Sequence, residues 1–401
     1  MPLNRRTVLG AGATALLASP VVSRRPLAQP ARLEVAGVYS LSGTFANVGD
    51  LLNKGNTWAF EHYRTAAGVP INYTLLDDQG DPGRAVRRVQ EVMAAGTRHI
   101  VGCTNSAIAL AVAREVHRAG GIYIHMAGAD EATGSECNRA SFRWPGASFT
   151  AVNATVRPFI ERNPQAKRWY TITGQYVFGE SLLTNTRALL QEAGCQHLGN
   201  SYHSLSEREY SGYITAALAA RPDVLAILNF GNQTVDVLRQ AVSFGMKRNT
   251  KIVVPWSTGL DQYQAWGPDI CDGVFFGVNY WHGVQAPGNK VIQDVVRQKT
   301  GGQTTNYLHA CGWAVGQLLV EAANKAGSTD VPAMIRALEG LSYEGPTGTE
   351  TVRAEDHQVI KDYYLMLGKP RSRMADRDDF AEVLAGTKAF QPPDRTGCRM
   401  A

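Results

Sequence analysis

The chain alternates short apolar segments with longer amphipathic ones, and this order constrains its fold more than any other feature of the sequence. Four early segments are short, apolar and rich in β-branched residues, and are predicted to be strands: 33–40, 71–77, 98–103 and 122–127. Helices are expected near 49–66, 82–95 and 106–119. Asp81 is placed to cap the second of these helices, with Pro82 at its first position. Such a series predicts a mainly parallel sheet with helices on both faces.

A second series of similar size follows residue 145. Its predicted strands are 168–173, 223–229, 251–255 and 273–279, and its predicted helices lie near 150–162, 179–193, 210–220 and 233–245. The remainder differs, with helices near 289–299, 306–326 and 331–339 before a predicted hairpin and strand in "GPTGTETVRAEDHQVIKDYYLML". We expect these later pieces to complete both sheets, so the chain would cross between two lobes more than once.

The predicted elements divide the chain into two lobes. A chain of 401 residues, 44% hydrophobic and 19% charged, is long enough for two cores. The expected parts are lobe 1 over 29–145, completed by about 281–350, lobe 2 over 146–280, completed by about 351–375, and a C-terminal tail over 376–401.

The first residues, "NRRTVLGAGATALLASP", have the layout of a secretory signal peptide. Arg5 and Arg6, followed by Thr-Val-Leu, resemble a twin-arginine export signal. The apolar run 8–18 is too short to span a bilayer. We therefore expect residues 1–28 to be removed, with Ala28 the last residue lost, and with Ala18 and Ser23 as alternative last residues. Arginines of this leader also inflate the net charge of +5, so no nucleic-acid partner is indicated.

Three predicted strands end in turns suited to binding a small molecule, and one of these turns is in "HMAGADEAT". The turn in "YTITGQYVFGESLL" carries Tyr176 and Phe178 and no Ser, Cys or His between them. In "GCTNSAIAL", Thr104, Asn105 and Ser106 precede a helix whose first N–H groups would attract an anion. In doubly wound folds, ligands bind at the carboxyl ends of strands. The alternatives are that the rings only pack the helix onto the sheet and that the polar residues only cap the next helix.

Other chemistry is weakly supported by the sequence. His309 and Cys311 lie two apart on a predicted helix, so they do not face each other. No C-x-x-C or H-E-x-x-H motif occurs, and the histidines show no ligand spacing. The six cysteines allow fifteen pairings, and their spacing selects none.

Several motifs together resemble one family. They are "GVYSLSGTFANVGD", "DDQGDP", "VGCTNSAIALAV", "YVFGESL", "LRQAVSFGM" and "AGSTDVPAMIRALEGLSYEGPTGTETVRAEDHQ". In this order and spacing the chain resembles, over nearly its whole length, the periplasmic solute-binding proteins of ABC transporters in the leucine/isoleucine/valine-binding family. The tail "AFQPPDRTGC" and "RWYTITGQYVFGESLL" are more similar to a branch associated with aromatic and other small organic acids. The resemblance implies a type I two-lobed α/β fold, each lobe a mainly parallel sheet with helices on both faces, joined by a multi-strand hinge.

The resemblance also implies roles for residues of the three turns. Tyr176 and Phe178 stand where the second lobe of the family lays an aromatic side chain against the ligand. Ser106 matches its carboxylate-binding serine, and Gly128 and Ala129 would offer backbone groups to the ligand. Val48 falls where relatives often carry a ring, which makes Phe45 the nearer wall.

Departures from the family pattern bear on the ligand. Asp130 stands where the amino-acid binders have Thr, and Trp256 aligns with the acid that pairs with the ligand ammonium. Asp130 is expected either to replace that acid or to cap a helix. Trp256, with Phe230 and Asn232 from "NFGNQT", favours a flatter and more apolar ligand. Finally, the aromatic-acid branch implies a disulfide between Cys137 and Cys398.

The function implied is that of an extracytoplasmic solute-binding component of an ABC importer. It would capture an amino acid or an aromatic or other organic carboxylate between its lobes and deliver it to permease subunits in the inner membrane. We expect a periplasmic monomer that needs no cofactor. Two alternatives stay open: a ligand sensor of the same fold that reports to a receptor or regulator and, as third choice, an enzyme acting on the bound ligand.

Overall fold

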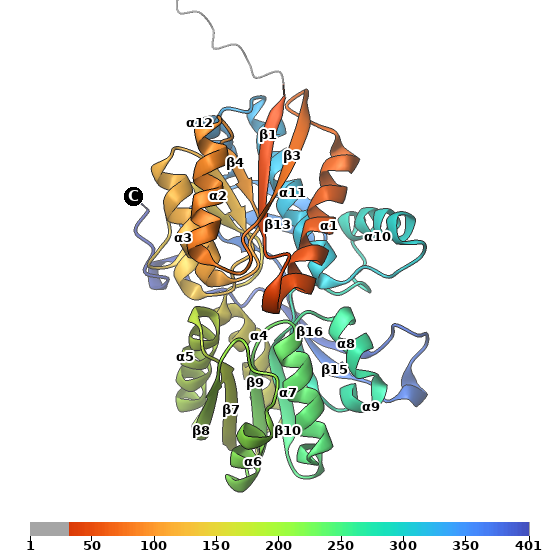
Figure 1. Cartoon of the computed structure of the whole chain (residues 1–401). Coiled ribbons are helices and arrows are strands. Elements are labelled where there is room, and N and C mark those ends of the chain that lie inside the picture. The colour runs from red at the N-terminus through yellow and green to blue at the C-terminus, as the bar shows by residue number, and fades with distance from the viewer. Residues whose placement is uncertain (1–31, 401) are drawn as a thin grey trace, which may run out of the picture.

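The structure, a computed structural model, describes residues 32–400 as two α/β lobes, one above the other in Figure 1. The predicted leader, 1–28, lies outside these residues. The first lobe is built on a six-stranded sheet of order β2-β3-β1-β4-β5-β6, parallel except where β2 meets β3. Its strands are β1 (Leu33–Tyr39), β2 (Thr65–Ala66), β3 (Val69–Asp77), β4 (His99–Val101), β5 (Ile122–His125) and β6 (Ser141–Arg143).

Helices cover both faces of this first sheet. They are α1 (Ala46–Tyr63), α2 (Pro82–Ala94), α3 (Ser106–Arg118), α11 (Tyr307–Ala326) and α12 (Val331–Leu338). The chain runs from β1 to β3 on one side and then to β4 on the other. Right-handed crossovers therefore place α1 and α2 on opposite faces. Helix α1 packs against α11, and α2 packs against α3.

The second lobe is built on a seven-stranded sheet of order β16-β15-β11-β10-β9-β7-β8. Its strands are β7 (Arg168–Gly174), β8 (Gln196–His203), β9 (Val224–Leu228), β10 (Lys251–Ser257), β11 (Phe275–Val278), β15 (Tyr363–Gly368) and β16 (Ala381–Thr387). The last two are antiparallel to their neighbours. Its helices are α4 (Ser148–Arg162), α5 (Val177–Glu192), α6 (Ser211–Ala219), α7 (Asn232–Ser243), α8 (Leu260–Trp266) and α9 (Pro268–Cys271).

Two late segments differ from the sequence expectation. The predicted hairpin forms a separate three-stranded sheet of β12 (Ser342–Gly345), β13 (Gly348–Val352) and β14 (Val359–Ile360), packed on α10 (Pro287–Thr300) and α11, and so completes neither large sheet. The segment 376–401, expected to be a tail, contributes β16, because its residues 381–387 pair antiparallel along the edge offered by β15.

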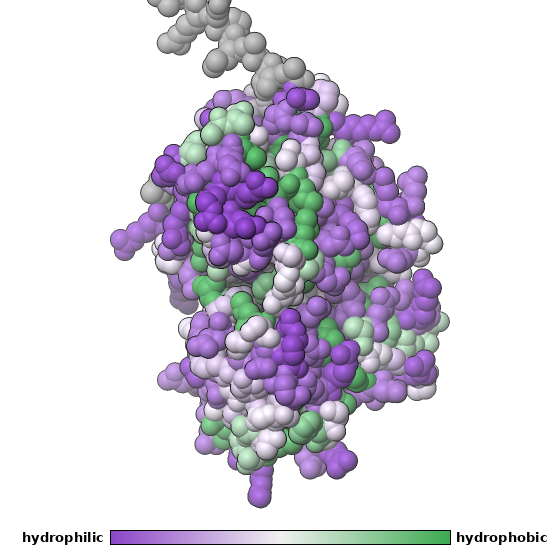
Figure 2. Space-filling view, in the orientation of Figure 1, coloured by the Kyte–Doolittle hydropathy of each residue, from purple (hydrophilic) through white to green (hydrophobic). Residues whose placement is uncertain are grey.

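The outer surface seen in Figure 2 is largely hydrophilic over both lobes. The deepest hydrophilic colour lies over α2, whose exposed side carries Arg84, Arg87 and Arg88 beside a shallow groove. Within residues 32–400 no helix combines the length and the apolar character needed to cross a bilayer.

Three segments connect the lobes, at 144–147, 279–286 and 361–362. Asn279 in the second segment joins the other two. Its side-chain Oδ1 accepts a hydrogen bond from the Gly146 N–H at 2.7 Å, and its backbone oxygen accepts one from Lys361 Nζ at 2.6 Å. The three connections are therefore held together as one hinge.

The hinge buries a charged side chain. Lys361 is 1% exposed, and its Nζ lies 4.3 Å from the centre of the Trp144 ring. The Trp144 indole donates to Glu350, whose carboxylate also accepts from the Tyr343 hydroxyl and from Thr347. Burial lowers the pKa of Lys361 from 10.5 to about 8, although the nearby Glu350 carboxylate opposes the shift.

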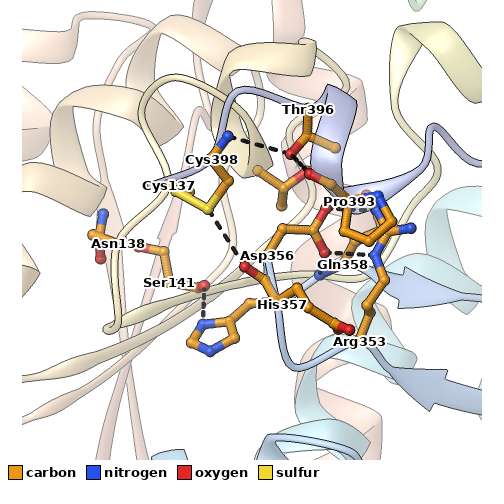
Figure 3. Close-up of a disulfide and its surroundings, with 12 residues drawn as sticks. Cys137, Asn138, Ser141, Arg353, Asp356, His357, Gln358, Pro393, Thr396 and Cys398 are labelled. Carbon is orange, nitrogen blue, oxygen red and sulfur yellow. Dashed lines mark hydrogen bonds and ion pairs between the residues drawn. A yellow bond between two sulfur atoms is a disulfide. The ribbon is translucent and has the colours of Figure 1, made fainter. Parts of the chain in front are cut away.

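A disulfide joins the end of the chain to the first lobe (Figure 3). Cys137 and Cys398, the pair that the resemblance implied, are bonded with their Cα atoms 5.5 Å apart. The segment before Cys398 is also held by Arg353, whose guanidinium donates to the Gln391 carbonyl at 2.9 Å and pairs with Asp356. The chain that leaves β16 in the second lobe is thus returned to the first.

We expect the disulfide to stabilise the fold. Replacing both Cys137 and Cys398 by Ser frees the long loop between them in the unfolded chain, so the free energy of unfolding should fall by about 2–5 kcal/mol. Denaturant titration measures the loss. Cys195→Ser, at a half-buried cysteine outside any disulfide, is the matched control and should change stability by less than about 1 kcal/mol. Equal midpoints for the two variants would contradict the expectation.

We expect Lys361 to make stability depend on pH. Between the folded pKa of about 8 and the ordinary value of 10.5, the unfolded chain holds a proton that the folded chain has released. The folded state is therefore increasingly favoured as pH rises through this window. Relative to Lys361→Met, the parent should gain on the order of 3 kcal/mol between pH 7 and pH 10.5. Unfolding curves of both proteins across this range measure the difference, and a flat or falling difference would refute the expectation.

Candidate functional site

A cavity lies between the lobes, where parallel strands of both sheets end. Its empty volume is about 340 Å³, part of which is open to solvent. The turn after β4, the end of β5, α1 and α11 line it from the first lobe. The start of α5, the turn after β9, and β10 line it from the second. Because residues of both lobes line this space, a solute held there contacts both lobes at once.

Half of the residues expected in the site line this cavity. They are Thr104, Asn105, Gly128, Phe178, Phe230 and Trp256. They come from five separate turns or strand ends, so the fold gathers them from distant parts of the sequence.

Six further residues line the cavity that were not predicted from the sequence, and they are mostly apolar: Leu52, Cys103, Met126, Tyr307, Leu308 and Cys311. Cys103 immediately precedes the expected site residue Thr104, and Met126 lies two positions before Gly128, so the sequence offers a signal for both. Tyr307, Leu308 and Cys311 begin α11, whose amino end is marked only by the capping residue Asn306.

Aromatic rings form the second-lobe wall of the cavity. Phe178 meets Trp256 edge to face, with ring centres 4.9 Å apart and planes at 84°, and meets Phe230 at 6.1 Å and 82°. Edge-to-face contacts are favourable because the positive ring edge meets the negative ring face. The wall is therefore rigid, flat-sided and apolar.

Gly128 lets the first lobe approach this wall. A Cβ atom at this position would lie 2.4 Å from Phe178 Cε2 and 3.1 Å from Trp256 Cη2. Any other residue would push the rings away from the end of β5, so the close approach requires glycine.

Phe45 and Tyr176 lie against each other across the two lobes without lining the cavity. Phe45, in the short helix η1 (Gly43–Phe45) of the first lobe, lies 6.4 Å from Tyr176 and 6.2 Å from Phe230, measured between ring centres. Nearby, the Thr44 hydroxyl donates to the Leu205 carbonyl across the lobes. These contacts hold the lobes together in this structure.

Helix α3 presents its amino end beside the cavity. Asn105 is its N-cap, with the side-chain oxygen accepting the Ile108 N–H at 3.0 Å. This bond fixes the orientation of the amide, whose NH₂ group is left for other partners. The N–H groups of Ser106 and Ala107 lie in the first turn, where a helix has no internal partner for them.

Ser106 and the turn 128–129 are bonded to each other. The Ser106 hydroxyl oxygen accepts the N–H groups of Gly128 and Ala129, each at 3.2 Å. The Gly128 carbonyl accepts from Ser148, and the Ala129 carbonyl accepts from Arg143. The backbone groups expected to face a ligand are therefore engaged within the protein, and neither Ser106 nor Ala129 lines the cavity.

Asp130 and Asn232 also lie outside the cavity. The Asp130 carboxylate accepts the Phe149 N–H in the first turn of α4 at 2.9 Å and is bonded by the Asn185 amide. Of the two roles expected for Asp130, the structure shows helix capping. Asn232 is exposed at the first turn of α7, because the chain there directs Gln233 inward.

The contacts of the lining residues show no catalytic arrangement. Burial raises the pKa of the Cys103 thiol to about 12 and raises that of Cys311 further, so both stay protonated near neutral pH. His309 faces away from Cys311 and packs against the Trp58 ring at 4.9 Å. Among residues 32–400 no cluster of three or more metal-ligating His, Cys, Asp or Glu side chains occurs.

Three known proteins that resemble this chain are each named as a binding protein for a solute, a substrate or amino acids. A substrate-binding protein of an amino acid ABC transporter from Pseudomonas fluorescens is 46% identical, and the alignment covers 92% of this chain and 98% of that chain with a TM-score of 0.87. The leucine-, isoleucine-, valine-, threonine- and alanine-binding protein of Pseudomonas aeruginosa is 22% identical over 79% of this chain and 84% of its own length. A solute-binding protein from Rhodopseudomonas palustris, solved with 3,4-dihydroxybenzoic acid, has the same fold at 19% identity, covering 91% of this chain and 99% of that chain with a TM-score of 0.81.

The family comparison covers most of the chain. A family model described as periplasmic binding protein matches residues 32–372, which includes all three connections and both lobes except β16. The two-lobed fold and the resemblance predicted from the motifs are thereby confirmed, and this chain belongs to the periplasmic binding protein family.

Proposed function

We propose that this chain is the extracytoplasmic solute-binding component of an ABC importer, which captures an amino acid or an aromatic or other organic carboxylate between its lobes. The observation that carries the proposal is the cavity lined from both lobes, with a helix amino end on one side and aromatic rings on the other. The family consists of solute-binding proteins that are not enzymes.

The geometry supports capture by a hinge. A solute that contacts Asn105 and Phe178 at once interacts fully only when the lobes are closed, so its binding favours the closed state. The closed lobes also make contacts of their own, through Phe45 and Tyr176. An affinity near micromolar, about −8 kcal/mol, suits capture followed by release.

The partners follow from the same proposal. The closed protein would deliver its solute, as a monomer, to permease subunits in the inner membrane. Transport energy would come from the ATPase subunits of the importer, so the binding protein itself needs no cofactor. Light scattering of the purified protein tests the monomeric state.

The ligand class draws on the relatives. One relative is named as part of an amino acid transporter, and another was solved with an aromatic acid. A thermal-shift screen of amino acids, aromatic carboxylates, amides and urea tests the proposal, because a solute that binds only the folded state raises the melting temperature. If no solute in such a screen shifts the melting temperature, the proposed function fails.

We expect Phe178 to contribute to affinity for the solute found. Phe178→Ala removes a central ring of the wall and should weaken binding by about 2 kcal/mol, roughly thirtyfold, in calorimetry. Phe380→Ala, at a buried ring of the second lobe packed on Tyr263, is the matched control and should lower the melting temperature without changing affinity. If Phe178→Ala binds like the parent and only melts lower, the ring serves core packing alone.

We also expect export with removal of the leader. The mature protein should begin near Gln29, so intact-mass measurement of periplasmic material should find a chain without residues 1–28. A mature species that retains Arg5 and Arg6 would overturn this expectation.

A further inference from the structure

We propose that the cavity selects its solute by charge: it accepts a carboxylate and rejects an ammonium group, and the indole N–H of Trp256 is the second lobe's hydrogen-bond donor to that carboxylate. The inference rests on the proposed solute-binding function and narrows its substrate class to carboxylates that lack an ammonium.

The first observation is the absence of a negative charge in the cavity wall. All the described residues that line the cavity are uncharged. Three buried carboxylates of the first lobe and its connections lie outside this lining. Asp130 accepts the Phe149 N–H of α4, and Glu350 is enclosed by Trp144, Tyr343 and Thr347. Asp78 Oδ1 accepts from the Ser40 hydroxyl at 2.6 Å and from the Gly80 N–H at 2.8 Å, while its Oδ2 has no partner among the described residues.

The second observation is that the two backbone carbonyls of the turn after β5 are also occupied. The Gly128 carbonyl accepts both the N–H and the hydroxyl of Ser148, at 2.8 and 2.9 Å. The Ala129 carbonyl accepts from the fully buried Arg143 guanidinium at 2.5 Å. An ammonium placed at this turn would therefore find the oxygens already bonded.

The third observation is that lining residues of both lobes carry hydrogen-bond donors without a partner among the described residues. Trp256 is 2% exposed, and its Nε1–H has no partner among the described residues. On the first lobe, the Thr104 oxygen accepts from the Ser40 N–H and the Asn105 oxygen accepts from the Ile108 N–H. The hydroxyl proton of Thr104 and the NH₂ group of Asn105 are without an acceptor in the contacts of residues 32–400.

The uncharged lining, the occupied carbonyls and the unpaired donors all favour a carboxylate over an ammonium. A carboxylate offers only acceptors and so pairs with the free donors and the positive end of α3. An ammonium offers only donors, and burying it without an acceptor or counter-charge costs several kcal/mol. A solute that carries both groups gains binding free energy from its carboxylate and loses binding free energy through its buried ammonium.

The test compares pairs of solutes that differ only by the ammonium, using the full mature protein. The pairs are phenylacetate with phenylglycine, 3-phenylpropanoate with phenylalanine, and 4-methylpentanoate with leucine. Calorimetry should find the member without ammonium at least about 100-fold tighter in every pair that binds. Equal or tighter binding of the amino acid in such a pair would overturn the inference while leaving solute capture intact.

A variant separates the Trp256 N–H from its ring. Trp256→Phe keeps an aromatic wall and removes the donor, so affinity for the preferred carboxylate should fall at least about tenfold. Trp266→Phe is the matched control, because its indole donates to the Val235 carbonyl at 3.0 Å in the second-lobe core, and it should leave affinity unchanged. Equal affinities for parent and Trp256→Phe would overturn the role given to Trp256.

The wider screen of solutes also tests the inference. If the wider screen finds a ligand outside these pairs, a carboxylate without an ammonium supports the inference, and a solute that carries an ammonium or lacks a carboxylate overturns it. If no solute of any class binds, the proposed function itself falls, and the inference falls with it.

Discussion

The structure depends on one constraint: after each strand of a parallel sheet, the chain must cross back to the end of the sheet where that strand began before it can form the next strand. In each lobe this brings the carboxyl ends of the strands, and the helix amino ends that follow them, to a single edge. The hinge around Asn279 sets these two edges against each other. Thr104, Asn105 and Gly128 on one edge and Phe178, Phe230 and Trp256 on the other become neighbours for this reason. No local interaction between them is required to bring them together.

Close packing at this junction determines what the cavity can hold. Gly128 admits the rings of Phe178 and Trp256 to within contact of the backbone, while the polar groups of Ser106 and Asp130 are consumed in holding the turn and α4 in place. The wall therefore combines apolar surface with a few unpaired donors. Side chains that look like ligand contacts in sequence serve here to fix the shape of the site.

Much of this could be predicted from sequence because the signals are local. Strand and helix alternation follows from apolar periodicity, and the capping of α2 by Asp81, with Pro82 at the first position, is confirmed. Strand β8 was missed because "QHLGNSYH" is polar and becomes a strand only by pairing with β7. The contribution of α11 to the cavity was missed because it depends on how that helix packs beside α1. The hydrogen-bond partners of Asp130 likewise depend on tertiary packing, because they lie on α4 and α5.

The disulfide at the end of the chain changes how the lobes are connected mechanically. Three passages between them are peptide, and the segment from β16 to Cys398 makes a fourth that ends on the first lobe through sulfur. The disulfide thus adds a covalent link between the lobes outside the hinge. Any rotation about the hinge must be accommodated by the short segment from β16 to Cys398, which Arg353 holds at Gln391. Without the Cys137–Cys398 bond, this segment would be held to the first lobe by noncovalent contacts alone, among them the Arg353–Gln391 hydrogen bond.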